Sequence, residues 1–400
     1  MMRILGLLFG ILLAVIVAAW VIGSLVATKG VQRVAEEPWP AGLGTLASVE
    51  KRLPLQKTSD GARRMAALAA PLGISFEKTG RTPDALRTAI GEYVKAEHGR
   101  ADSTIGGPPA EVLAYLNAHA AEIDTLRDHL LNGPPIVWER DVSQGYDAPM
   151  PNLLGHMEVM RLFAARALLR GRGNDVQAWD DLHAAFRVGQ ILEPRPELIS
   201  QLIVLAIARS VNSVAWKLPP ANATWLAEMQ NLDHRRLLLG GYQYDMWTMW
   251  RHGERTMKGP MTTLGKPYLR WSIVSMADQQ RATAQELASM TACGFDGAAF
   301  AQRHSKAIPK WNIIANISTP NLDVAWQRAF RSVAEREATM NAMRIAQGQP
   351  IVEKSVCSDG AWRFENDRLS FSRDLPKSNV TEMVMPLSLA IPARTTRQST

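Results

Sequence analysis

The sequence predicts a mostly α-helical protein with a transmembrane helix at its N-terminus and a small β-hairpin near its C-terminus. Three observations lead to this fold class. A long run without charged residues stands at the start, apolar residues recur at helical spacing up to residue 350, and strand-like alternation appears only after that point. Because short links make consecutive helices antiparallel, the body is predicted to be an array or bundle of helical hairpins.

The N-terminal run is long enough to cross a membrane. After a short flank, residues 1–3, the stretch from Ile4 to Ala27 holds 24 residues without a charge. As a helix it spans about 36 Å, against about 30 Å for a bilayer core. A cleavable secretory signal has an apolar region of only about 7–15 residues and a small-x-small cleavage site. We therefore expect a retained signal-anchor and a single-pass protein whose first partner is the lipid bilayer.

The charges that flank the run do not fix its orientation. Arg3 on one side is matched by Lys29 and Arg33 on the other. The usual signal-anchor arrangement keeps the short N-terminus inside and exports the body, which would then be periplasmic in a Gram-negative host. The opposite orientation stays open at this stage.

The sequence predicts a stalk and then an N-terminal helical subdomain. Residues 28–44 are expected to space the body from the bilayer, because Pro38 and Pro40 break a helix twice and glycines follow. In the subdomain, residues 45–133, helix start and stop signals place helices at 45–53, after Ser59, after Thr82-Pro83-Asp84, and at 110–131.

An irregular, proline-rich loop, residues 134–151, separates this subdomain from the main helical body, residues 152–349. Loops of this length are often functional. Helical periodicity in the main body predicts seven helices, at residues 152–170, 175–192, 196–218, 223–231, 234–257, 266–292 and 321–347.

The C-terminal part is expected to differ from the body. Residues 350–375 carry strand-like segments around Asn366-Asp367, which suits a hairpin turn. Residues 376–400 are rich in Ser, Thr and Pro and are predicted to be disordered.

One helix pair, Ala164–Leu192, resembles a tetratricopeptide unit in its spacing of small and aromatic residues. The resemblance covers this pair only, and no second copy follows after about 34 residues. It therefore implies a helix-turn-helix at this place and no membership of that family.

Composition predicts a folded protein and argues against several functional classes. Apolar residues make up 46% and charged residues 21%, with 12 Trp and 17 Met, which is typical of a globular chain. The net charge is +7, but the basic residues are mixed with acidic ones and form no run with stacking aromatics, so we expect no nucleic-acid partner. Metal-binding, phosphate-binding and dinucleotide motifs are missing, so no metal or cofactor is expected.

Cys293 and Cys357 are the two cysteines of the chain. They are candidates for a disulfide if the body is exported, and inert core thiols if it is cytosolic. The sequence leaves both alternatives open, because it does not give the distance between them.

Two groups of side chains are candidates for a functional site. Aromatic residues near ionic ones predict a groove for a ligand or partner, with core burial as the alternative; these residues are Trp138, Tyr242, Tyr244, Trp247 and Trp250. An acid and histidine set on helices that could pack together, Glu158, Asp180 and His183, is the candidate for catalysis.

These observations favour a non-enzymatic interaction or scaffold component of a membrane-associated process, with another membrane or periplasmic protein as its partner. This hypothesis predicts an exposed apolar patch or a concave groove near Trp247 and Trp250 or beside the loop 134–151. The alternative is a membrane-tethered, hydrolase-like enzyme with an acid and histidine site in a helical cleft.

Overall fold

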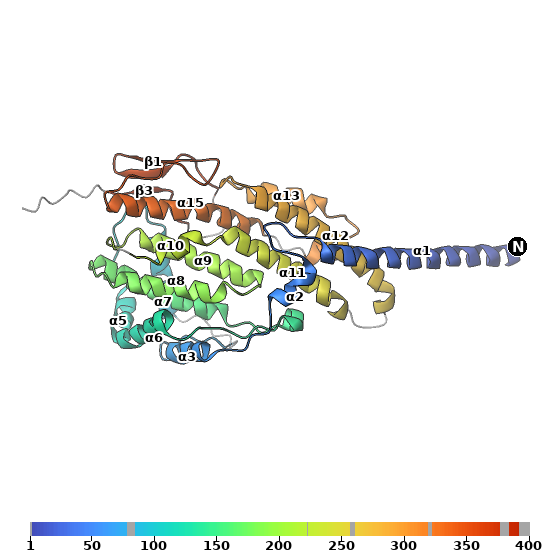
Figure 1. Cartoon of the computed structure of the whole chain (residues 1–400), viewed down its shortest axis with the longest axis horizontal. Coiled ribbons are helices and arrows are strands. Elements are labelled where there is room, and N and C mark those ends of the chain that lie inside the picture. The colour runs from blue at the N-terminus through green and yellow to red at the C-terminus, as the bar shows by residue number, and fades with distance from the viewer. Residues whose placement is uncertain are drawn as a thin grey trace, which may run out of the picture.

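The computed structural model describes residues 2–77, 85–221, 223–256, 261–318, 322–376 and 384–391. These residues are mostly helical and carry a small three-stranded antiparallel sheet near the C-terminus, which confirms the predicted fold class (Figure 1). The helices are α1 (Met2–Glu36), α2 (Val49–Arg52), α3 (Asp60–Ala69), α4 (Ala85–His98), α5 (Ala110–Ala118), α6 (Ala120–Asn132), α7 (Leu153–Arg172), α8 (Ala178–Leu192), α9 (Leu198–Ala215), α10 (Leu226–Asn231), α11 (His234–Thr256), α12 (Met261–Ser289), α13 (Gly297–Ala307), α14 (Ile313–Ser318) and α15 (Asp323–Ala346). Two short 3₁₀ helices are η1 (Leu46–Ser48) and η2 (Val142–Asp147).

Two helices of the described chain are long and apolar enough to cross a membrane. The first is α1, which projects from one end of the body and buries none of its apolar segment against other residues (Figure 1). The second is α9, of which 78% is buried inside the body, as in the core helix of a water-soluble domain. The described chain therefore has one N-terminal candidate membrane helix, which fits a single-pass protein.

The segment 28–44, expected to be a stalk, is packed against the body instead. Helix α1 continues to Glu36, and its last turns lie along α12. The prolines end the helix only after Glu36, and the chain then turns back so that the Trp39 amide donates to the Gly44 carbonyl at 2.8 Å. Trp39 is 4% exposed and meets the Tyr242 ring edge-on. Local helix breakers such as the two prolines do not predict that this indole is buried against α11.

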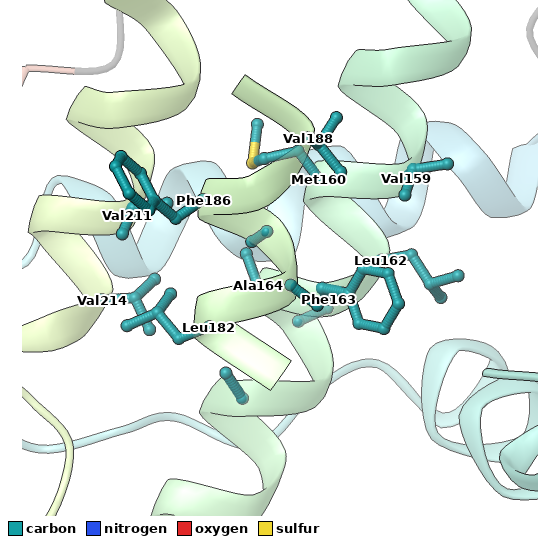
Figure 2. Packing of buried hydrophobic residues seen from close by; sticks show 14 of the residues in the cluster. Val159, Met160, Leu162, Phe163, Ala164, Leu182, Phe186, Val188, Val211 and Val214 are labelled. Atoms are coloured by element: carbon teal, nitrogen blue, oxygen red, sulfur yellow. The ribbon is translucent and has the colours of Figure 1, made fainter. Parts of the chain in front are cut away.

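The largest part of the core lies between α7, α8 and α9 (Figure 2). Asn152 caps α7, because its side chain accepts from the Leu154 amide at 3.1 Å. Phe163 and Leu182 of the neighbouring helices are fully buried where α7 and α8 pack together. At the other end of α7, Arg170 donates to Asp181 of α8 at 2.9 Å, which fixes α8 antiparallel to α7.

A second core joins α11, α12 and α15 to the end of α1. Its largest fully buried side chains are Trp247 and Phe330. Helices α9 and α15 are linked by a buried ion pair, in which the Arg209 guanidinium donates to both carboxylate oxygens of Glu335 at 2.6 and 2.8 Å.

The N-terminal subdomain differs from the prediction in two places. The helix expected at 45–53 is the 3₁₀ turn η1 followed by the four-residue α2. Ser59 caps α3 as expected, since its hydroxyl accepts from the Ala62 amide. The stretch expected as one helix at 110–131 is two, α5 and α6, because the His119 backbone leaves the helical region at φ −107°. The predicted helix start at Thr82-Pro83-Asp84 lies outside the described residues.

The C-terminal hairpin is confirmed and gains a third strand. Strands β1 (Trp362–Glu365) and β2 (Arg368–Phe371) pair through a turn in which Asn366 and Asp367 both have positive φ, as a type I′ turn requires. Strand β3 (Ser388–Ala390) pairs with β2. The prediction that all of 376–400 is disordered is therefore wrong for this strand, whose Leu389 is fully buried.

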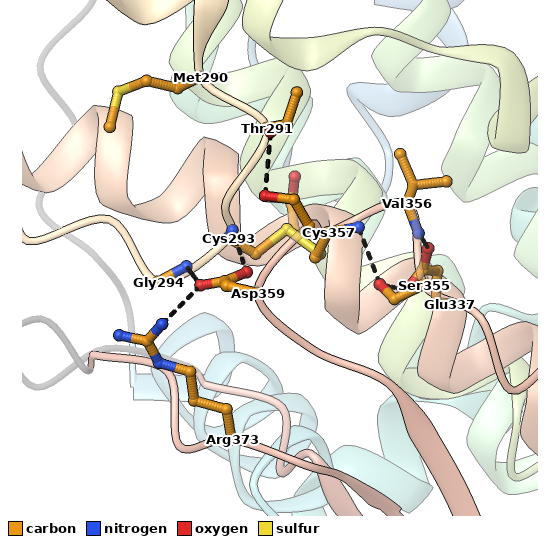
Figure 3. Close-up of a disulfide and its surroundings, with 12 residues drawn as sticks. Met290, Thr291, Cys293, Gly294, Glu337, Ser355, Val356, Cys357, Asp359 and Arg373 are labelled. Atoms are coloured by element: carbon orange, nitrogen blue, oxygen red, sulfur yellow. Dashed lines mark hydrogen bonds and ion pairs between the residues drawn. A yellow bond between two sulfur atoms is a disulfide. The ribbon is translucent and has the colours of Figure 1, made fainter.

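Cys293 and Cys357 form a disulfide, which settles the pairing that the sequence left open (Figure 3). Both residues are buried. Asp359 holds the loop that follows α12 beside the bridge, because its carboxylate accepts from the backbone amides of Cys293 and Gly294 at 2.8 and 2.9 Å. The bridge ties the segment before the hairpin to the end of α12.

Candidate functional site

A cavity of about 590 Å³ lies between the end of the 134–151 loop, the start of α9, and helices α11 and α12. We call it the Asp245 groove. Its lining combines two acidic residues, Asp245 and Glu197, with Gln280 and four methionines, Met150, Met246, Met249 and Met276. Tyr146 and Ile199, which are 57% and 47% exposed, also line it.

The loop side of the groove is fixed by local hydrogen bonds and by one glycine. Asp141 accepts from the Ser143 amide and hydroxyl at 3.1 and 2.6 Å, which starts η2. Gly145 then has φ +61° and lies against His252 of α11, where a Cβ atom would come within 2.7 Å of the imidazole ring. Only a glycine combines this backbone conformation with this close approach. Tyr146 is thereby held at the groove, with its hydroxyl 3.8 Å from the sulfur of Met249.

Helix α11 supplies the acidic side chain of the groove. Tyr244 and Trp247 stack with ring centroids 5.4 Å apart and are both buried. Asp245 and Met249 stand four residues apart, so they share one face of the helix, and both line the groove. Core packing of the two aromatic rings therefore sets the rotation of α11 that presents Asp245.

Glu197, at the start of α9, already has a cationic partner. The Arg195 guanidinium donates to its two carboxylate oxygens at 2.6 and 3.0 Å, and the Ser200 hydroxyl donates to it at 3.0 Å. Arg195 also donates to the carbonyls of Glu139 and Pro149, so it joins the 134–151 loop to α9. The charge of Glu197 is thus compensated within the body.

Asp245 has no such partner. Within the described residues its carboxyl group makes no hydrogen bond and no ion pair, although its side chain is largely buried. Burial, followed by repulsion from Glu197, raises the pKa of Asp245 to about 7. In the same cavity, Gln280 is 2% exposed, and its side-chain oxygen has no hydrogen-bond partner among the described residues. The groove therefore contains three polar groups without a hydrogen-bond partner among the described residues, the Asp245 carboxyl, the Gln280 side-chain oxygen and the Tyr244 hydroxyl, beside thioether and aromatic surface.

This arrangement suits a hydrogen-bond donor with a positive charge. An ammonium or guanidinium group would place a positive charge beside the Asp245 carboxyl and would donate a hydrogen bond to the side-chain oxygen of Gln280. Methionines adapt their shape to apolar ligands because they are unbranched and polarizable. In the part of the chain that the structure describes, no group of three or more His, Cys, Asp or Glu residues is placed to hold a metal ion.

A second cavity, of about 530 Å³, is lined by residues of α4, α7, α9 and α15, of which six are basic and one, Glu92, is acidic. We call it the cationic cleft. Arg87 and Arg209 are bonded to Glu158 and Glu335. Burial lowers the pKa of His98 to about 3, so this side chain is neutral at physiological pH. The other cations that line the cleft are Lys95, Arg161 and Arg328.

The aromatic residues chosen from the sequence lie mainly in the core around the Asp245 groove. Tyr242, Tyr244 and Trp247 are at most 5% exposed, and of these Tyr244 also lines the groove. Trp250 is half-buried and packs against the second core. Trp138 lies elsewhere, beside Phe76 and His156 under the first core.

The three candidate catalytic residues are not brought together. Glu158 is bonded to Arg87 near the start of α7. Asp180 is exposed, and His183 stacks on Trp225 with ring centroids 5.0 Å apart; both lie in α8 beside the far end of α7. Along the helix axes this separates Glu158 from the other two by on the order of 15 Å. These residues therefore form no shared acid and base site.

The sequence places Asp245 among the ionic residues beside the aromatic ones of this helix, but no local pattern marks it or its partners in the groove as a site. Asp245 stands between aromatic residues, where an acid at the rim of a core is ordinary. Gln280, Met276 and Met150 come from two other segments, so their convergence depends on how α12 and the loop pack. The recurring methionines at 246 and 249 were the one local signal.

No protein-family model, curated protein or solved structure matches this chain.

Proposed function

We propose that this chain is a single-pass, membrane-anchored binding protein whose helical body holds a basic segment of another membrane or extracytoplasmic protein in the Asp245 groove. The observation that carries this proposal is the unpaired carboxyl of Asp245, which shares a methionine-lined cavity with the unbonded side-chain oxygen of Gln280.

In the free body the Asp245 carboxyl is largely buried and has no cationic partner among the described residues. An acid that is largely removed from water without a partner destabilises the fold or takes up a proton. A lysine or arginine from a partner would remove this penalty and form charge-assisted hydrogen bonds. The discrimination would be strong, because a partner without the cation leaves Asp245 and Gln280 unbonded.

The position of the groove favours a partner segment that lies close to a membrane. Met276 and Gln280 of α12 follow Val274, which packs on Gly30 of α1, by less than two helical turns. The groove is thus nearly level with the end of α1. Segments of other membrane proteins that flank a span on the same side of the membrane come within reach of the groove, and one that carries a Lys or Arg beside apolar residues has the chemistry that the groove fits.

The disulfide supports an exported body. Disulfides persist in oxidising compartments and are rare in the cytosol. The bridge between Cys293 and Cys357 therefore favours the signal-anchor orientation, with the short N-terminus inside.

Photo-crosslinking in intact cells tests the proposal. The crosslinker p-benzoylphenylalanine replaces Tyr146 at the groove or, as a matched control, the exposed Val176 before α8. We expect a discrete protein adduct from position 146 that Asp245→Lys abolishes and that position 176 does not give. An adduct that persists in Asp245→Lys, or that both positions give alike, contradicts the proposal.

A second candidate function is binding of an anion in the cationic cleft. It is favoured by Arg161, which lines the cleft and makes no hydrogen bond or close ion pair with another described residue. Titration of the purified chain with inorganic phosphate tests it. Saturable binding that Arg161→Gln weakens supports this function, and binding that Arg161→Gln leaves unchanged contradicts it.

A further inference from the structure

The contacts between α1 and α12 show that these helices run parallel. A Cβ atom at Gly23 would lie 4.0 Å from the indole nitrogen of Trp271, and one at Gly30 would lie 2.9 Å from Val274. Farther along, Arg33 donates to Asp278 at 2.6 Å. Residue numbers rise together on both helices, so the N-terminal part of α12 extends beside α1 in the direction of the apolar run (Figure 1).

This direction carries α12 to the level of the membrane surface. About 20 helical residues cover a bilayer core of about 30 Å, so a span that begins at Ile4 leaves the core near Gly23. Trp271 lies beside Gly23, and Tyr268 is one turn closer to the N-terminus of α12. If α1 is the anchor, these two side chains stand at the boundary between lipid and water.

The same region exposes a cluster of apolar and aromatic side chains. Tyr268 and Trp271 are 36% and 38% exposed, and Trp20 of α1 is 39% exposed. Trp311 and Ile313, just before and at the start of α14, are 49% and 61% exposed. In water such a cluster is unfavourable, whereas Trp and Tyr are the side chains enriched at membrane interfaces.

Hydrogen bonds fix α14 next to α12. The Tyr268 hydroxyl donates to the Trp311 carbonyl and accepts from the Ile313 amide, both at 2.9 Å. The rings of Tyr268 and Trp311 meet edge-on with centroids 6.3 Å apart. The two elements therefore present their exposed rings as one surface, which is part of the fold and needs no rearrangement to meet lipid.

Basic residues accompany this surface. Lys306 of α13 and Lys310 before α14 are exposed. Lysines beside aromatic side chains favour contact with anionic headgroups, and each one near the surface contributes about 1 kcal/mol. The lysines and the exposed aromatic rings therefore both favour contact with a lipid surface.

We propose that Trp20, Tyr268, Trp271, Trp311 and Ile313 form an aromatic collar that sits in the headgroup layer of the bilayer. The inference rests on the proposed anchoring by α1 and adds a second membrane contact to it. Because α1 passes directly into packing on α12, the collar would hold the body at a fixed height and orientation, with the Asp245 groove facing segments near the membrane.

Spin labels on the full chain in vesicles of phosphatidylcholine and phosphatidylglycerol test the collar. The native cysteines are joined in the disulfide, so single cysteines at Trp311, Val176 and Val15 can be labelled selectively. The ratio of collisions with oxygen to collisions with a water-soluble nickel complex reports burial in lipid. We expect a several-fold higher ratio for Trp311→Cys than for the exposed control Val176→Cys, and the highest ratio for Val15→Cys in the span.

The three positions separate the two proposals. A lipid-like ratio at position 15 with a water-like ratio at position 311 overturns the collar and leaves the anchor intact. A water-like ratio at position 15 overturns the anchor itself. Since Trp311 is half exposed, its replacement is expected to leave the fold unchanged, which circular dichroism of the labelled protein checks.

Discussion

Arg33, near the end of α1, donates to Asp278 of α12 at 2.6 Å, on the same helix pair in which Gly30 packs against Val274. Both partners of this ion pair are partly exposed, so it contributes at most about 1 kcal/mol. Close packing between the helices is therefore the main reason that the candidate membrane helix and the body form one unit without a stalk.

Substitution at the helix contact tests this packing. Gly30→Leu would drive its side chain into Val274, since even a Cβ atom comes within 2.9 Å. We expect the free energy of unfolding to fall by about 1–3 kcal/mol, as for other overpacked cores. Gly10→Leu is the matched control in the same helix, because a Cβ atom there meets no atom within 4 Å. Chemical unfolding in detergent should be unchanged for the control, and equal losses for both variants would contradict the account.

Asp245 should make the body more stable in mild acid. Its pKa is about 7 when folded and about 3.9 in an unfolded chain. Between these values the folded state holds a proton that the unfolded state releases, so the free energy of unfolding falls as pH rises from 4 to 7. Asp245→Asn removes this loss, and we expect it to stabilise the body at pH 8 by on the order of 1–2 kcal/mol. Urea unfolding at pH 5 and pH 8 measures the difference, with Asp180→Asn as the exposed control.

Buried histidines should make the body less stable in acid. Burial lowers the pKa of His156 to about 4 and that of His234 to about 3. Below pH 6.5 these histidines bind protons in the unfolded chain but stay neutral in the folded one, so the free energy of unfolding falls as pH drops toward 4. His156→Gln should make this acid limb shallower. His119→Gln, at a half-exposed position, is the control; an acid limb as steep in His156→Gln as in the unsubstituted chain would count against this assignment.

The disulfide should add stability and report the compartment of the body. Cys357→Ala is expected to lower the free energy of unfolding by about 2–4 kcal/mol. A maleimide polymer applied to denatured protein from whole cells should shift its mobility only after reduction, once for each of the two thiols. Full modification before reduction would show that the bridge does not form in the cell and would contradict an exported body.

The sequence predicted those features that depend on neighbours along the chain. The apolar run, the Ser59 cap and the Asn366-Asp367 turn follow from local rules of helix and turn formation. The buried position of Trp39 depends on Tyr242, some 200 residues away, and the short strand β3 forms only because β2 offers it an edge.

The candidate site shows the same division. A helix with aromatic and acidic residues was visible, but the role of Asp245 was not. Within the described residues Asp245 has no cationic partner, the nearby Glu197 is paired with Arg195, and Gln280 comes from another helix. Such arrangements arise from tertiary packing, which no spacing within α11 encodes.

A charge exchange across the interface tests the central claim most directly. The partner peptide captured from position 146 identifies the basic residue that faces Asp245. We predict that Asp245→Lys abolishes the adduct and that replacing the partner's basic residue with glutamate restores it in the Asp245→Lys background. Adduct yields that are the same in the unsubstituted chain and in Asp245→Lys, whether the partner carries its basic residue or glutamate, would contradict the account.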